Sequence, residues 1–114
     1  MVVEEFNEYI NYETTTDQYT GLLYAAFKGN IKVIEMLLKA GANARHKNKF
    51  GIGVLHVAAQ GDQPIVIYFF KMKGLNLREP DARMSTPLHW ACWSKAEVTL
   101  QYLLAWVDAL EDRD

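Results

Sequence analysis

The sequence has little of several features that define common classes of protein. Its single cysteine, Cys92, cannot form an internal disulfide, so a disulfide-stabilised scaffold is excluded. No uninterrupted apolar run is longer than the six residues from Ile65 to Phe70, whereas a membrane-spanning helix needs about 20. The N-terminus, "MVVEEFNEYI", carries glutamates where a signal peptide has basic residues before a long apolar stretch. We therefore expect neither a membrane span nor a targeting signal in this chain.

The chain also lacks a strong excess of either charge. The net charge is −2 over 114 residues, a length that corresponds to one domain. Nucleic-acid-binding proteins usually have a marked basic excess arranged as a stripe. The bases of residues 28–49 are dispersed instead, and they are Lys28, Lys32, Lys39, Arg45, Lys47 and Lys49. We interpret them as solvated surface residues and expect no nucleic-acid partner.

An internal repeat organises the chain. The segment "TPLHWACW" (86–93) aligns with "GVLHVAAQ" (53–60) and with "TGLLYAAF" (20–27), so each copy begins one constant period after the copy before it. These alignments superimpose three alanines and three leucines, namely Ala25, Ala58, Ala91, Leu22, Leu55 and Leu88. The period, about 33 residues, holds without insertions, which indicates an array of stacked structural units.

Each repeat has the pattern of two short helices. Thr86 is a suitable N-cap residue, and Pro87 suits the first position of the helix that follows. Gly41 and Gly74 follow the expected second helices, where a left-handed residue commonly ends a helix. The pattern predicts first helices that begin near Gly21, Val54 and Pro87, and second helices that begin near Ile31, Pro64 and Glu97. Their short connections predict antiparallel pairs.

The period, T-P-L-H-x-A and G-A-N together resemble the ankyrin repeat over residues 17–110. The resemblance implies an all-α solenoid of antiparallel helix pairs, with hairpin-like loops on one side and a concave surface that binds a protein or peptide. We assign residues 17–49, 50–82 and 83–114 to three repeats, and residues 1–16 to a capping helix or degenerate half repeat. The chain stops where a fourth repeat should begin, which predicts a fragment in which Leu103, Leu104 and Trp106 partly face a missing neighbour.

The repeat also decides how the chemically notable residues are interpreted. His89 is matched by His56 one period earlier, which favours a structural role in which the ring bonds loop backbone. Cys92 and His89 provide only two of the four ligands that a zinc site needs. Cys92 stands where other repeats have Ala26 and Ala59, so we predict that it is buried and unreactive. We expect no catalytic residue, metal or cofactor in this chain.

Large apolar side chains are expected on the concave surface, where the loops and first helices face a partner. The repeat period aligns Phe27, Gln60 and Trp93 in one column of the first helices. A second, half-buried column is predicted to contain Tyr24, Val57 and Trp90. Such rings can also be ridge residues that only pack against loops. We favour a binding patch, because aromatic-rich patches concentrate binding energy. Its predicted members are Tyr19, Phe27, Phe50, Ile52, Gln60, Trp90 and Trp93.

Two longer phrases, "LHVAAQGDQPI" (55–65) and "STPLHWACWSKAEVTLQYLLAWV" (85–107), are similar to the N-terminal ankyrin region of protozoan DHHC-type protein palmitoyltransferases. This resemblance implies a longer membrane-embedded parent with the repeats on its cytosolic face, where they recruit substrates. It also implies that Trp90 contributes to a groove for an extended peptide. The catalytic Asp-His-His-Cys motif of that family is absent from this chain. Two alternatives stay open: a stand-alone ankyrin adaptor, and a small catalytic or metal protein built on Cys92 and His89.

Overall fold

A computed structural model describes the backbone of residues 20–111 and the side chains of residues 20–105. This part of the chain is helical with connecting loops and contains no strand. The helices are α2 (Gly21–Lys28), α3 (Ile31–Lys39), α4 (Val54–Gln60), α5 (Pro64–Met72), α6 (Pro87–Ser94) and α7 (Glu97–Glu111). All six begin at the residues that the sequence predicted. The proposed N-terminal cap, residues 1–16, lies outside the described residues, and the assigned repeat boundaries stay a prediction.

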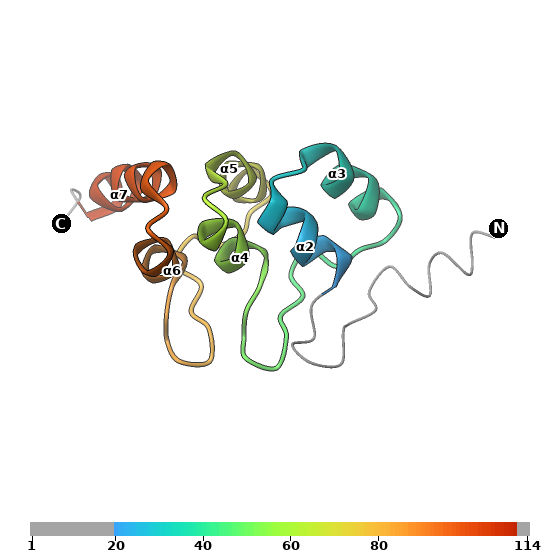
Figure 1. The fold of residues 1–114 in the computed structure, drawn as a ribbon, viewed down its shortest axis with the longest axis horizontal. Helices are drawn as coiled ribbons and strands as arrows, with labels where there is room; N and C mark the ends of the chain where they lie inside the picture. Colours follow the sequence, from blue (N-terminus) through green and yellow to red (C-terminus); the bar gives the residue numbers. More distant parts are fainter. Residues whose placement is uncertain (1–19, 112–114) are drawn as a thin grey trace.

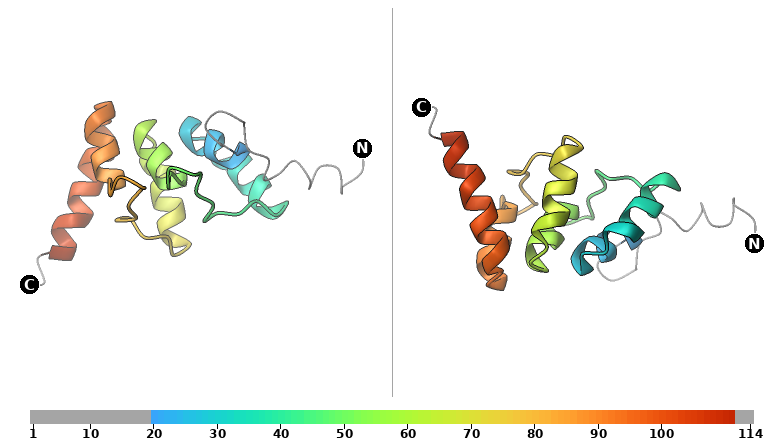
Figure 2. Two further views of the ribbon diagram at one scale, coloured as in Figure 1. Left: turned by 90° about the horizontal axis from the view of Figure 1, so that it is seen from below. Right: turned by 90° about the horizontal axis from the view of Figure 1, so that it is seen from above.

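The helices form two layers that continue along the stack. Figure 1 shows the second helices, α3, α5 and α7, in one layer and the first helices, α2, α4 and α6, in the other. The loops 40–53 and 73–86 project away from both layers, on the side of the first helices. The two further views in Figure 2 show the same succession of helix pairs along the long axis. Contacts between neighbouring first helices, α2 with α4 and α4 with α6, hold the pairs together.

A left-handed residue joins the two helices of each pair. Gly29, Asp62 and Lys95 have φ values of 78°, 57° and 59°, and they are spaced by the same repeat period. At the first of these turns the amide of Gly29 donates to the carbonyl of Ala26, which ends α2. Only glycine adopts this conformation without steric cost, so Asp62 and Lys95 carry a strain that the first repeat avoids.

Small residues between first helices allow the repeats to approach closely. Ala26 and Ala59 are fully buried at these contacts. A Cβ atom on Gly61 would lie 2.2 Å from the carbonyl oxygen of Phe27, so any larger residue would push α4 away from α2. The core continues outward to second-helix residues such as Ile34 and Phe70, which are also fully buried.

The structure corrects two predictions made for the third repeat. Cys92 is exposed rather than buried. The matching residues, Ala26 and Ala59, are covered because α4 packs against α2 and α6 packs against α4. In the described part of the chain, no further first helix follows α6 to cover Cys92. Leu103 is buried within the core, although we expected it to face a missing neighbour, because α7 packs against α5 and α6. Leu104 is exposed, as predicted, and the side chain of Trp106 lies outside the described residues.

Candidate protein-binding surface

The most exposed aromatic ring in the first-helix layer is that of Trp93. Its side chain is 64% exposed near the C-terminal end of α6. The ring centroid lies 6.0 Å from that of His89 and 6.4 Å from that of Trp90, with an interplanar angle of 58° between the two indoles. The three rings together form a continuous aromatic platform on α6. Trp90 and Trp93 belong to the predicted patch, whereas His89 was not among its predicted members.

Trp90 is half-buried, as predicted, and an unforeseen contact holds it in place. Its indole Nε1 donates a hydrogen bond of 3.0 Å to Oδ2 of Asp81, in the loop before α6. The other carboxylate oxygen, Oδ1, accepts the amides of Arg83 and Ser85 at 2.9 and 2.8 Å. Burial by itself raises the pKa of Asp81, but these donated bonds together lower it below its ordinary value. Asp81 is therefore ionised, and its carboxylate positions Trp90 by accepting the indole N–H.

Asn48 shapes the preceding loop as Asp81 shapes its own, by accepting two loop amides. Its Oδ1 accepts the amides of Phe50 and Ile52 at 2.9 and 3.0 Å, one period before the corresponding bonds of Asp81. The two loops are joined because the amide of Ala82 donates to the carbonyl of Phe50 at 2.8 Å. Sequence reasoning missed both acceptors. The available signal was an amide and a carboxylate separated by one repeat period, immediately before predicted loop contacts.

The other predicted patch residues have unequal exposure. The ring of Phe50 is 48% exposed on its loop, while Ile52 is partly buried and packs against the core. Gln60 is exposed on α4 between Phe27, which is partly buried on α2, and Trp93 on α6. The column of first-helix residues thus spans all three repeats, but a polar side chain separates its two rings. Tyr19 lies outside the described residues.

The second column is less uniform than we predicted. Tyr24 is exposed on α2, and Val57 is completely buried instead of half-buried. The reason is that α4 is the central first helix, with α2 on one side and α6 on the other. Within this column only Trp90 has the intermediate exposure that the sequence suggested.

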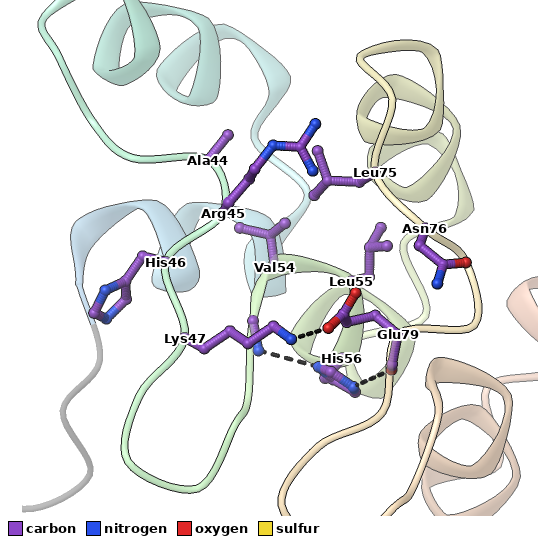
Figure 3. Close-up of a pocket in the computed structure, with 11 residues that line it drawn as sticks. Ala44, Arg45, His46, Lys47, Val54, Leu55, His56, Leu75, Asn76 and Glu79 are labelled. Atoms are coloured by element: carbon purple, nitrogen blue, oxygen red, sulfur yellow. Dashed lines mark hydrogen bonds and ion pairs between the residues drawn. The ribbon is translucent and has the colours of Figure 1, made fainter.

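His56 has the structural role that the repeat predicted for it. Its Nδ1 accepts the amide of Gly53 at 3.0 Å, so Nε2 carries the proton and donates it to the carbonyl of Glu79 at 2.8 Å (Figure 3). The side chain is only 1% exposed. Burial lowers the pKa of His56 from 6.5 to about 4, because its effect exceeds the opposing attraction of Asp81. The ring is neutral near pH 7 and ties two loops together. In α6, Nδ1 of His89 accepts the amide of Thr86 in the same way.

A pocket beside His56 is too small for a cofactor. It lies between the loop residues 44–47 and 75–79, and the ion pair of Lys47 with Glu79 crosses it (Figure 3). Its volume of about 50 Å³ suits no more than a few water molecules. Within the described residues, no three His, Cys, Asp or Glu side chains are grouped so that they could hold a metal ion. Of the helices described, none combines the length and hydrophobicity that crossing a bilayer requires.

Comparisons with known proteins agree with this architecture. The model of ankyrin repeats in three copies matches residues 22–111. Palmitoyltransferase AKR1 of Kluyveromyces lactis is 29% identical over 99 residues, which are 83% of this chain and 13% of that protein. RelA-associated inhibitor of Mus musculus is 34% identical over 70 residues, or 61% of this chain and 8% of that protein. Notch-regulated ankyrin repeat-containing protein B of Danio rerio is 40% identical over 50 residues, or 43% of this chain and 45% of that protein.

The chain spans less than half the length of each of these relatives. The match to the repeat model nevertheless covers all six described helices except the first residue of α2. The chain therefore belongs to the ankyrin-repeat family, and its stacked helix pairs form a protein-interaction module.

Proposed function

We propose that the surface formed by the first helices and the loops binds an extended segment of a partner protein, with Trp93 as the central anchor. The exposure of the Trp93 ring carries this proposal. Exposed apolar area costs about 25 cal/mol per Å² in water. Among the described side chains, Trp93 is not one of those that pack against the core, so core packing does not account for this large ring. Aromatic anchors beside fully packed neighbours are typical of the residues that dominate binding.

Trp90 supports the anchor by forming the inner wall of the platform. Its hydrogen bond to Asp81 and its packing against the core fix the ring before any partner arrives. A preformed aromatic wall lowers the entropy cost of binding, since less side-chain freedom is lost. Phe50 extends the apolar surface from the neighbouring loop.

We further propose that this module recruits substrates to a DHHC-type protein S-palmitoyltransferase. The similarity to Palmitoyltransferase AKR1 over 83% of the chain supports this assignment, as do the sequence segments 55–65 and 85–107 in repeats two and three. The parent would then be an integral membrane protein with these repeats on its cytosolic face. The single cysteine of this chain is not part of such a catalytic centre.

A stand-alone ankyrin adaptor is the second candidate. It is supported by the similarity to RelA-associated inhibitor and to the Notch-regulated ankyrin repeat-containing proteins, whose names do not mention a transferase. Sequencing the gene downstream of the codon for Asp114 distinguishes the two candidates directly. A downstream Asp-His-His-Cys motif between membrane helices supports the transferase, and its absence supports the adaptor.

Peptide selection tests the binding surface itself. Twelve-residue peptides enriched from a random display library on the wild-type protein are synthesised and titrated by fluorescence polarisation. Trp93→Ala should weaken their binding about 30-fold, which corresponds to about 2 kcal/mol, and should leave the Tm nearly unchanged. Tyr68→Ala is the matched control, because Tyr68 is an exposed aromatic residue on α5 in the opposite layer. Normal binding by the Trp93 variant together with a lowered Tm would show that this tryptophan is structural, and the binding face would then have to be sought on the second helices.

A further inference from the structure

We infer that the partner segment is an acidic peptide whose carboxylates alternate with apolar side chains. This inference rests on the proposed function, since it concerns the same surface. It follows from the charges that the first helices and the loops before them present, and from the aromatic rings beside those charges.

The described segments of this surface contain more basic than acidic residues. Residues 20–28, 48–60 and 81–94 form the first helices and the ends of the loops, and their Lys and Arg residues are Lys28, Lys49 and Arg83. All three are exposed. The same segments contain a single acid, Asp81, which is 9% exposed and whose oxygens accept three N–H donors from within the fold. The one carboxylate of these segments therefore points inward, and the exposed charged side chains that the structure describes in them are all positive.

The cations stand beside the predicted apolar contacts. The ammonium of Lys28 lies 5.9 Å from the ring centroid of Phe27, and that of Lys49 lies 5.3 Å from the centroid of Phe50. In the third repeat, Arg83 occupies the loop position that Phe50 has one period earlier, and the two tryptophans follow it on α6. Cations and aromatic rings therefore recur together along the stack. A peptide that fits this arrangement places carboxylates next to aliphatic or aromatic side chains.

A neutral or basic peptide would gain less from this surface. Complementary charges raise the association rate and exclude partners of the wrong sign, and exposed pairs contribute modestly to affinity. The rings supply most of the affinity, and the cations select among apolar segments. Selectivity for acidic segments is thus expected to depend on salt, while the contribution of Trp93 does not.

The peptides enriched from the random library provide the test. Their mean net charge should be clearly negative relative to the unselected library. In titrations, Lys49→Glu and Arg83→Glu should each weaken peptide binding about fivefold. Raising the NaCl concentration should weaken peptide binding by the wild-type protein. Lys39→Glu is the matched control, because it makes the same charge change at an exposed position on α3 in the other layer. It should change binding less than twofold, as a change of distant surface charge does.

The outcomes separate this inference from the proposed function. Enriched peptides that are neutral or basic but lose binding in Trp93→Ala overturn the acidic partner and leave the binding surface in place. An equal loss in Lys39→Glu and Lys49→Glu overturns it as well, since the effect would then come from net charge alone. Tighter binding of a 12-nucleotide single-stranded DNA than of any selected peptide overturns the choice of a protein partner. Peptides that bind Trp93→Ala as well as the wild type, or a failure to enrich any peptide, contradict the proposed function itself.

Discussion

Replacing Asp81 by asparagine should release Trp90 while preserving the loop that Asp81 shapes. The equivalent residue of the preceding repeat is already an asparagine, and its Oδ1 accepts two loop amides in the same pattern. An asparagine at position 81 can therefore keep the bonds from the amides of Arg83 and Ser85. Its side-chain amide would then face the indole Nε1 of Trp90, which places two donors against each other.

The expected cost follows from that one lost bond. A hydrogen bond to an ionised acceptor contributes about 1.5–3 kcal/mol, and a half-buried donor without a partner retains part of its desolvation cost. We expect Asp81→Asn to lower the free energy of unfolding by about 2 kcal/mol, which lowers the Tm of a domain of this size by roughly 10 °C. Asp81→Ala should cost more, because it also removes the acceptor of the two loop amides.

Urea unfolding followed by circular dichroism measures this change, and a double-mutant cycle assigns it. Trp90→Phe keeps a large ring but removes the indole N–H, so Asp81→Asn should cost much less in that background than in the wild type. The same loss in both backgrounds would mean that the carboxylate acts only through the loop. No loss in the wild type would refute the argument that the bond to Trp90 stabilises the fold.

Three further predictions concern other sites. Because the pKa of His56 is lowered from 6.5 to about 4, the unfolded chain binds a proton between these pH values that the folded chain does not. The stabilisation that neutral His56 contributes should be fully present above pH 6.5, and the free energy of unfolding should fall by up to about 3 kcal/mol as the pH drops to 4. His56→Gln should flatten this pH dependence, as measured by urea unfolding. Lys95→Gly should raise the free energy of unfolding by about 0.5–1 kcal/mol, because Lys95 has a left-handed φ of 59°, and a lower Tm would contradict this reasoning. Cys92 should react with a thiol reagent in the folded protein at a rate near that of the unfolded chain, and strong protection would show that another surface covers it.

The helix pairs and their order could be predicted from the sequence because an ankyrin repeat depends mainly on local spacing. The leucines and alanines that recur once in every repeat mark the buried side of each first helix, and Pro64 and Pro87 mark helix starts. Each unit meets only its neighbours, so a regular period in the chain becomes a regular stack in space. The exposure of Trp93 followed from the same spacing, since the inward positions of α6 were already occupied.

Contacts between units decided what the period could not show. Cys92 shares its register with Ala26 and Ala59, yet it is exposed because burial at that position comes from the next helix pair and not from the residue itself. The bond from Trp90 to Asp81 likewise depends on how the loop folds back over α6. A carboxylate nine residues before an indole has no local reason to meet it, and only the tertiary structure brings the two within 3.0 Å.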